Sequence, residues 1–290
     1  MQATNAQSAG LDEKTVLRKR MDKVKHKIAV ISGKGGVGKT VTAVNLAVAF
    51  AMHGHENRVG LLDADLHGPC VPKMLGMEDQ KLKVGPIGAL PAVGPLGVKV
   101  ASMAFVLEGK ETPVVWRGPL KMRAIEPLLS EILWGDLDFL LIDLPPGTGD
   151  EPLSVLKLLP EMDGVVIVTI PSEVSQTVVR KSITFSQQLN VPVIGIVENM
   201  SGFVCPDCGK HVDIFKSGGG EKVAKEHDVP FLGKIPLDPR VCEASDLGHP
   251  FIMQYPDSPA AKAFMDIVNK IKAYIENKEK AASKDKTSKK

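Results

Sequence analysis

A glycine-rich segment near the N-terminus has the residue types and spacing of a phosphate-binding loop. Residues 33–40 read Gly-Lys-Gly-Gly-Val-Gly-Lys-Thr and fit the pattern G-x-x-x-x-G-K-[ST] at every position. Glycines let backbone N–H groups turn inward around an anion, and a helix that begins here adds the positive end of its dipole. Lys39 can then reach the β- and γ-phosphates, and the Thr40 hydroxyl can ligate Mg²⁺. The segment predicts a nucleoside triphosphate site.

Acidic residues follow two later apolar runs. Asp63 and Asp65 come after Leu61-Leu62, and Asp143 ends the run that begins at Phe139. A carboxylate at the end of a buried strand beside a phosphate loop can hold the water shell of Mg²⁺. We therefore expect Asp63 and Asp143 near the metal, and Asp65 to orient the attacking water. The alternative for Asp63 and Asp65 is a solvated acid in a turn.

The same glycines also fit a second pattern, because Gly33, Gly35 and Gly38 match the dinucleotide fingerprint G-x-G-x-x-G. Asp63 would then be the acid that binds a ribose. A dinucleotide fold, however, needs neither the Lys39-Thr40 pair nor a second acid at Asp143. Phosphoryl transfer accounts for all of these residues and is the favoured interpretation.

Two cysteines form a C-x-x-C pair, Cys205-Pro206-Asp207-Cys208. One pair supplies two thiolates, whereas a tetrahedral zinc site or a cubane cluster needs four ligands. Three interpretations are open: a redox dithiol, a zinc site that recruits His211 and Asp213, or two pairs that meet across a symmetric dimer. The lone cysteines Cys70 and Cys242 are interpreted as small packing residues.

Apolar runs alternate with helical patterns through the chain. Strands are expected at 28–31, 58–62, 98–103, 139–142, 165–170 and 193–197, and helices at 40–52, 120–134, 175–189, 218–227 and 260–276. Continuous apolar strands indicate burial on both faces, and alternation with helices indicates a parallel sheet with right-handed crossovers. The Gly- and Pro-rich residues 80–97 are expected to form a loop. The predicted fold is α/β, with a doubly wound, mostly parallel sheet flanked by helices.

Charge divides the chain into three segments. The net charge is +2, of which residues 1–27 contribute +4 and residues 276–290 contribute +3, so the body between them carries −5. Both ends are polar and poor in apolar residues, which is typical of disorder. We expect residues 1–25 to be a disordered basic segment, 26–276 a single domain, and 277–290 a disordered Lys-rich tail.

Several function classes are disfavoured by composition. The chain has no run of 18 apolar residues, and its first 27 residues contain no apolar core of a secretory signal. Aromatic residues make up only 4%, which disfavours a stacking platform for single-stranded nucleic acid. Four cysteines in 290 residues do not make a disulfide scaffold, so we expect a reducing cytoplasm.

The phosphate loop resembles the deviant Walker A motif of the family that includes Mrp/ApbC iron–sulfur carriers, nitrogenase iron protein, and the MinD and ParA ATPases. The resemblance rests on the early lysine, Lys34, in Lys-Gly-Gly-Val-Gly-Lys-Thr. It implies an ATP-dependent homodimer in which Lys34 reaches the nucleotide of the partner subunit. The alternative is a lysine that is merely exposed on the loop.

Five further segments are similar to the Mrp/ApbC family over residues 26–275. They are Val115-Trp116-Arg117-Gly118-Pro119, residues 144–150, Glu198-Asn199-Met200-Ser201, Cys205-Pro206-Asp207-Cys208-Gly209 and residues 233–238. The resemblance implies a P-loop NTPase that hydrolyses ATP, and slow turnover is expected because the sequence offers no obvious arginine finger. It also implies a [4Fe–4S] cluster, bridged by Cys205 and Cys208 of two subunits and delivered to apo-proteins.

The resemblance also assigns residues around the nucleotide. It places Asp65 in switch I and residues 145–150 in switch II, and it implies that Thr42, Asn199 and Pro236 contact the nucleotide. An asparagine in a turn is the alternative for Asn199. Arg117 is the weak candidate for an arginine finger in the chain.

The rival function is a MinD/ParA-like positioning ATPase with a structural zinc, or no metal, at the cysteines. Phe264, Ile267, Val268, Ile271 and Ile275 recur at helical spacing, and MinD-like ATPases end in an amphipathic helix that binds membranes. Such a stripe is more often buried in a core. A positioning ATPase also has no use for paired cysteines. We therefore favour the carrier, with itself and apo iron–sulfur proteins as partners, and without nucleic-acid binding or stable membrane association.

Overall fold

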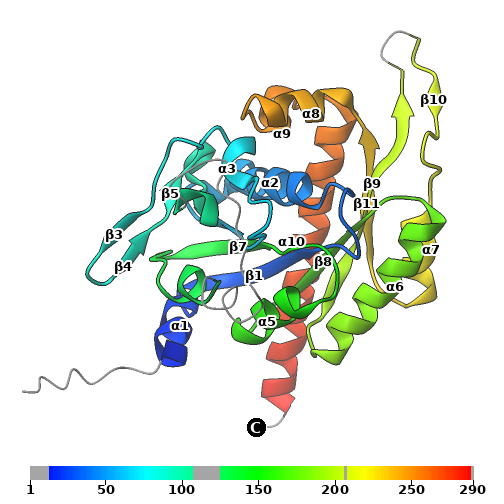
Figure 1. Ribbon diagram of the computed structural model, residues 1–290. Coiled ribbons are helices and arrows are strands. Elements are labelled where there is room, and N and C mark those ends of the chain that lie inside the picture. The colour runs from blue at the N-terminus through cyan, green and yellow to red at the C-terminus, as the bar shows by residue number, and fades with distance from the viewer. Residues whose placement is uncertain (1–12, 107–124, 206–207, 289–290) are drawn as a thin grey trace, which may run out of the picture.

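A nine-stranded sheet runs through the part of the chain that the computed structural model describes, residues 13–106, 125–205 and 208–288 (Figure 1). Its order is β10-β9-β8-β1-β7-β2-β6-β5, and β11 also pairs with β9. The strands are β1 (Val24–Ile31), β2 (Val59–Asp63), β5 (Ala92–Val93), β6 (Lys99–Ser102), β7 (Leu137–Asp143), β8 (Gly164–Thr169), β9 (Val193–Val204), β10 (His211–Val212) and β11 (Phe231–Leu237). All pairings are parallel except those of β5 and β10, which confirms the expected mostly parallel sheet.

Helices follow the strands on both faces of the sheet. The α-helices are α1 (Glu13–Met21), α2 (Lys39–Phe50), α3 (Val71–Met74), α5 (Asp150–Leu158), α6 (Glu173–Gln188), α7 (Gly219–Glu226), α8 (Pro239–Asp246), α9 (Phe251–Gln254) and α10 (Pro259–Ser288). Residues 125–130 are also helical. Short irregular turns are η1 (Ala51–His55), η2 (Pro95–Gly97) and η3 (Met103–Phe105).

The two faces of the sheet carry separate hydrophobic clusters. Along β1, Ile28 and Val30 belong to one cluster, while Ala29 and Ile31 belong to the other. The first cluster takes in α2, α3, α9 and α10, and the second takes in α1, α5, α6, α7 and the helix at 125–130. Successive side chains of a strand point to opposite faces, so continuous apolar strands are buried on both sides.

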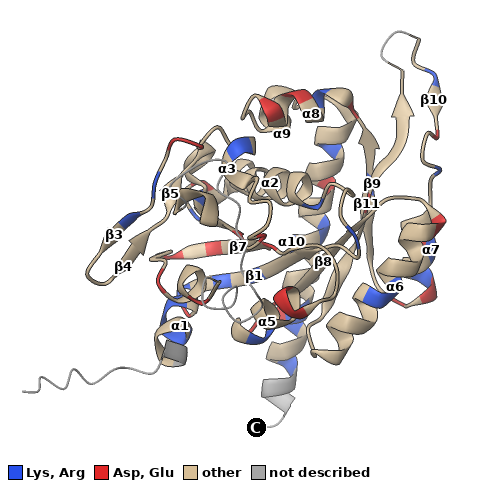
Figure 2. Ribbon diagram, in the orientation of Figure 1, with Lys and Arg blue, Asp and Glu red and all other residues tan. Residues whose placement is uncertain are grey.

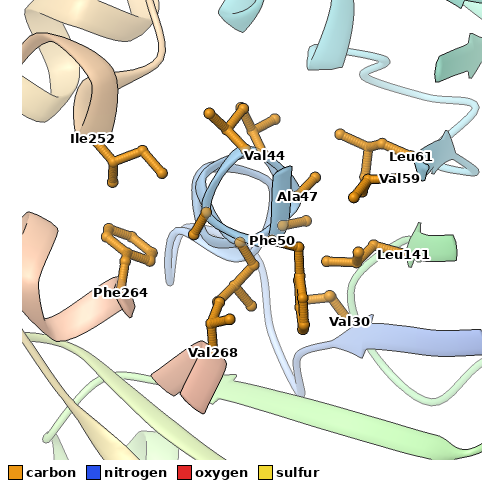
Figure 3. Close-up of a cluster of buried hydrophobic side chains, with 14 of the residues drawn as sticks. Val30, Val44, Ala47, Phe50, Val59, Leu61, Leu141, Ile252, Phe264 and Val268 are labelled. Atoms are coloured by element: carbon orange, nitrogen blue, oxygen red, sulfur yellow. The ribbon is translucent and has the colours of Figure 1, made fainter. Parts of the chain in front are cut away.

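Helix α2 is the centre of the first cluster (Figure 3). Its buried residue Phe50 stacks on Phe139 of β7, with ring centroids 4.2 Å apart. Phe264 and Val268 of α10 lie on another side of the same helix in Figure 3. Because α2 begins at Lys39, this packing fixes the helix whose first turn carries the phosphate loop.

The apolar stripe of α10 is part of this core. Phe264, Ile267, Val268, Ile271 and Ile275 are each at most 3% exposed, and α10 packs against α2 and β11. The core-packing interpretation of the stripe is therefore confirmed. Among the described residues, no helix combines the length and the apolar character needed to cross a membrane.

The described parts of both ends, residues 13–25 and 277–288, contain helix where disorder is expected from composition. Residues 13–21 form α1, and its Leu17 and Met21 are buried in the second cluster. At the other end α10 continues to Ser288 beyond its last buried residue, Ile275. Lys, Glu and Ala are good helix formers, so a polar segment can extend a helix that is already anchored. Lys and Arg lie on α1 and along α10 (Figure 2). The division of the chain, with a single domain at 26–276, stays a prediction.

The segment expected as a loop contains short strands. β3 (Lys83–Gly85) and β4 (Gly88–Leu90) form a hairpin, and β5 adds an antiparallel strand to β6. The turn at Pro86-Ile87 explains why glycine and proline dominate here, since hairpin turns need such residues. The hairpin projects from the body of the molecule (Figure 1).

Replacing Phe264 by alanine tests the packing of α10 on α2. Phe264 is 1% exposed, so Phe264→Ala removes buried apolar surface and leaves a cavity, and the free energy of unfolding should fall by about 3–5 kcal/mol. Urea unfolding measures this change. The control Leu247→Ala lies at a side chain that is 61% exposed and should cost less than about 0.5 kcal/mol. A loss at position 264 as small as that of the control would contradict the packing described here.

Candidate nucleotide and cysteine sites

The phosphate loop joins the end of β1 at Ile31 to the start of α2 at Lys39. Gly36 and Gly38 have positive φ angles of 76° and 80°, which side chains with a Cβ rarely adopt. At Gly38 a Cβ would lie 2.2 Å from Nδ2 of Asn199, so the close approach also needs glycine. Gly33 is equally confined, because a Cβ there would lie 2.7 Å from the carbonyl oxygen of Val178 in α6. The loop is held from two sides by the body of the protein.

Lys39 and Asp143 are buried at the mouth of the loop and form one cluster with the half-buried Thr40. Lys39 Nζ lies 2.6 Å from Asp143 Oδ1, and the Thr40 hydroxyl donates to Asp143 Oδ2 at 2.7 Å. Lys39 is 6% exposed and Asp143 is fully buried. Burial raises the pKa of Asp143, while the Lys39 ammonium opposes that shift. The cation and the carboxylate therefore neutralise each other where phosphate and Mg²⁺ are expected.

Asp63 stands beside Asp143 on the neighbouring strand, since the two are register partners in the β2–β7 pairing. Asp63 Oδ2 accepts hydrogen bonds from the Ser102 hydroxyl at 3.0 Å and the Val71 amide at 3.2 Å. Its side chain is almost wholly buried. Burial first, and then the nearby charge of Asp143, raises the pKa of Asp63 to about 8. A divalent cation would relieve both effects, so the donor set fits Mg²⁺.

Asp65 lies in the segment that leads away from β2. Its amide donates to Asp63 Oδ1 at 3.3 Å, and its own Oδ1 accepts from the His67 amide at 3.3 Å. His67 Nε2 lies 3.3 Å from Glu151 Oε1 at the start of α5. This contact joins the segment after β2 to the segment after β7. The two segments therefore meet beside the carboxylates, as the expected switch regions would require.

Four more loop residues complete the predicted phosphate site. Lys34 is half-buried, and its backbone carbonyl accepts from the Ser32 hydroxyl at 3.0 Å. Gly35 is exposed and Val37 is buried. Thr42 is fully buried one turn into α2, and its hydroxyl donates to the Gly38 carbonyl at 2.8 Å. Thr42 thus supports the loop from behind, and its contact with the nucleotide stays a prediction.

Asn199 and Pro236 lie on neighbouring strands, because Ile235 of β11 is the register partner of Asn199 on β9. The Asn199 amide Nδ2 donates to the Val37 carbonyl at 2.9 Å, so this side chain reaches the phosphate loop directly. Pro236 lines a cavity of about 380 Å³ with Phe203, Asp238, Arg240 and Pro259. The contact of Asn199 and of Pro236 with the nucleotide stays a prediction.

Cys205 follows β9 directly, and β10 returns antiparallel to it with His211 opposite Val204. We call residues 200–205 and 208–212 the cysteine hairpin; they project from the body in Figure 1. The Cys205 amide donates to the Lys210 carbonyl at 3.0 Å, and the Gly209 amide donates to the Cys205 carbonyl at 2.9 Å. These bonds hold Cys205 beside the residues that follow Cys208.

The donor groups around Cys205 and Cys208 bear on the zinc interpretation. His211 lies over Gly202, where a Cβ would be 2.5 Å from its Nε2, and its Nδ1 lies 3.8 Å from Asp213 Oδ1. Within the described ranges, no group of three or more His, Cys, Asp or Glu side chains is placed to hold a metal ion. Of the two cysteines, Cys205 is half-buried and Cys208 is exposed.

The packing interpretation of Cys70 and Cys242 is wrong, because both side chains are exposed. Cys70 lies in the turn before α3, and Cys242 lies on the outer side of α8, with its Sγ 3.9 Å from Asp246 Oδ2. Residue type alone does not predict whether a cysteine lies on the buried or the exposed side of a helix or turn. Arg117 and the motif at 115–119 lie outside the described residues.

Two residues of the site were missed at the sequence level. Ser102 ends β6 and donates to Asp63, and Glu151 begins α5 and meets His67. The only sequence feature that points to Ser102 is its place near the end of the expected strand at 98–103. Glu151 had none, because its contact depends on how two loops meet in space.

The raised pKa of Asp63 predicts how stability depends on pH. In the folded protein this carboxyl binds a proton up to about pH 8, whereas in the unfolded chain it does so only to about pH 4. Its contribution to the free energy of unfolding is therefore present below the unfolded value and is lost as pH rises through about 8. Urea unfolding without nucleotide or Mg²⁺ should show stability falling between about pH 4 and 8 more steeply in wild type than in Asp63→Asn. Identical slopes in the two proteins would contradict the assignment.

Comparison with known proteins agrees with this geometry. The model of the NUBPL iron-transfer P-loop NTPase family matches residues 23–272. A protein of Methanocaldococcus jannaschii named iron-sulfur cluster carrier protein is 52% identical over 262 residues, which are 90% of this chain and 89% of that protein. A protein of Saccharolobus solfataricus with the same name is 49% identical, over 96% of this chain and 92% of its own length.

Solved structures show the same fold. A nucleotide-binding protein of Archaeoglobus fulgidus, solved with ADP and with Co, has a TM-score of 0.73 and 40% identity over 82% of this chain and 92% of that chain. The cell division ATPase MinD of Pyrococcus furiosus has a TM-score of 0.62 at 24% identity, over 86% of this chain and 98% of its own. The match over residues 23–272 and the identity to full-length relatives show that this chain belongs to the NUBPL iron-transfer P-loop NTPase family.

Proposed function

We propose that the chain is an ATP-dependent iron–sulfur cluster carrier that delivers its cluster to apo-proteins. One observation carries this proposal: a single strand, β9, contacts the phosphate loop through Asn199 and leads directly into Cys205. The relatives from Methanocaldococcus jannaschii and Saccharolobus solfataricus, which are named carriers, support it. The proposed compartment is the cytoplasm, where thiols stay reduced; apo iron–sulfur proteins are the proposed recipients.

The residues of the loop fit the hydrolysis of ATP. The backbone amides of residues 33–40 would surround the phosphates, with Lys39 released from Asp143 to neutralise the β- and γ-phosphates. Thr40 and Asp143 would hold Mg²⁺, with Asp63 beside them, and that ion would screen the charge on the phosphates. Asp65 is the residue proposed to orient the attacking water. Positioning and charge neutralisation account for most of this chemistry.

A second copy of the chain is the proposed partner at the cysteine hairpin. Val204, Val212, Ile214 and Phe215, at the end of β9, in β10 and directly after it, are between 41% and 51% exposed. Val174 is 71% exposed on α6, and its neighbour Glu173 pairs with Lys216 at 2.9 Å, so this side chain lies beside the same surface. Two copies would cover these apolar groups and bring four thiolates together, the number that a bridging [4Fe–4S] cluster needs.

Anaerobic reconstitution with iron and sulfide tests the cluster. Wild type should load about four iron atoms per dimer and gain visible absorbance, because two cysteine pairs complete the cluster site. Cys205→Ala should lose most of this iron. Cys242→Ala, which alters an exposed cysteine on α8, should load like wild type. Equal iron in the Cys205 variant and in wild type would refute the assignment of the cysteines.

Mixing two inactive variants tests whether Lys34 acts across a dimer. Lys34→Ala keeps its own Lys39 but offers the partner no early lysine, whereas Lys39→Ala cannot bind ATP well but still offers Lys34. A mixed dimer then holds one complete site, and random exchange should restore about a quarter of wild-type ATP hydrolysis. Phosphate release measures the rate, and mass-tagged subunits confirm exchange. No recovery in a mixture that has exchanged its subunits would show that Lys34 acts within its own subunit.

A further inference from the structure

The buried carboxylate of Glu198 joins the base of the cysteine hairpin to α7. Glu198 lies on β9, is fully buried and accepts three hydrogen bonds. Oε1 accepts from the Gly218 amide at 2.8 Å and from the Ser201 hydroxyl at 2.5 Å, and Oε2 accepts from the Gly220 amide. The nucleotide chemistry described above does not use this residue.

These bonds replace the cap that α7 lacks. The helix begins after Gly218, which has no side chain to satisfy the first amides, and a carboxylate is favoured at the positive end of a helix dipole. Val223 and Ala224 bury α7 in the second core cluster. Glu198 therefore ties residues 198–201 of β9 to the start of α7.

The next residue points the opposite way. Neighbouring side chains of a strand lie on opposite faces, so Glu198 reaches α7 while Asn199 reaches the phosphate loop at Val37. The Val37 carbonyl and the Gly38 amide belong to one planar peptide unit. If the Gly38 amide turns toward a phosphate, the Val37 carbonyl that Asn199 contacts must tilt with it. Nucleotide binding would then shift Asn199 on β9.

An irregular stretch of backbone, the joint at Met200, separates this point from the thiols. Met200 has a positive φ of 54°, so the strand is irregular directly after Asn199, and the Ser201 hydroxyl bonds back to Glu198. Beyond it, Phe203 is the register partner of Leu237 on β11, and the strand then enters Cys205. Without Glu198, the joint at Met200 would absorb a shift at Asn199 locally.

We propose that Glu198 is a positioning residue that transmits movement of the phosphate loop to Cys205 by anchoring residues 198–201 to α7. The inference rests on the proposed function, because it gives the means by which a nucleotide would alter the grip on a cluster. The two sites are coupled only if the nucleotide-bound and empty states hold the hairpin differently. Glu198 determines how strongly the position of Cys205 differs between the nucleotide-bound and empty states.

Alkylation of Cys205 in the cluster-free protein tests the inference. Iodoacetamide modification, mapped by peptide mass spectrometry, gives the rate with and without a nonhydrolysable ATP analogue. In wild type the analogue should change the rate by about fivefold or more, the range of ordinary coupling between sites. In Glu198→Gln the ratio should approach one, because the amide keeps the size but meets one backbone N–H with its own NH₂ group. Analogue affinity should stay within about threefold of wild type, since Asn199 still contacts the loop.

Two further variants keep the result interpretable. Glu173→Gln breaks the exposed pair with Lys216 beside the same hairpin, and should keep the wild-type ratio. Ser201→Ala removes one of the three donors and leaves both bonds to α7, so its ratio should fall between wild type and Glu198→Gln even where the latter folds poorly. A wild-type ratio of one, or an unchanged ratio in both the Glu198 and Ser201 variants, overturns the inference. Iron loading is measured separately, so failure of the carrier function and failure of the coupling are distinguished.

Discussion

The buried contact between Lys39 and Asp143 is the interaction around which the nucleotide site is arranged. Its two charges are 2.6 Å apart and nearly without solvent, so each depends on the other while the site lacks a ligand. Removing one partner of such a pair leaves an uncompensated charge, which is strongly destabilising. The pairing of β2 with β7 then sets Asp63 beside Asp143, so that two carboxyl groups lie at the same edge. A magnesium nucleotide would supply a partner for each group: the phosphates for Lys39, and the metal ion for Asp63 and Asp143.

Burial on both faces of the sheet makes that edge rigid. The strands that end in Ile31, Asp63 and Asp143 lie between the two hydrophobic clusters, so their carboxyl ends have little freedom to separate. Helix α2 adds a second constraint, since its packing on β7 and α10 fixes the first turn that carries Lys39. Ligands of open α/β sheets bind outside the carboxyl ends of the strands, and this rigidity is the physical basis of that placement.

Much of the fold and the centre of the site could be predicted from sequence because they depend on local patterns. The phosphate loop, Asp63 and Asp143 each follow a recognisable apolar run, and parallel strands bring their ends together. Ser102, Glu151 and the anchoring of Asn199 on Val37 depend on contacts between distant segments, for which single-sequence patterns carry no signal. The ends of the chain misled for another reason. Their polar composition suggested disorder, although the same residues favour helices once Met21 or Ile275 is buried.

The alternation of side chains along β9 limits how many residues can be added or removed before Cys205. Side chains along a regular strand alternate between faces, so adding or removing one residue between Phe203 and Cys205, where β9 pairs with β10, would turn Cys205 to the opposite face of the hairpin. The pairing of β9 with β10 would slip by the same step. Insertions of two residues would preserve the facing but move the thiols outward by about 7 Å, the advance of two residues in an extended strand. Surface loops generally tolerate insertions, whereas the end of β9 before Cys205 must keep its number of residues.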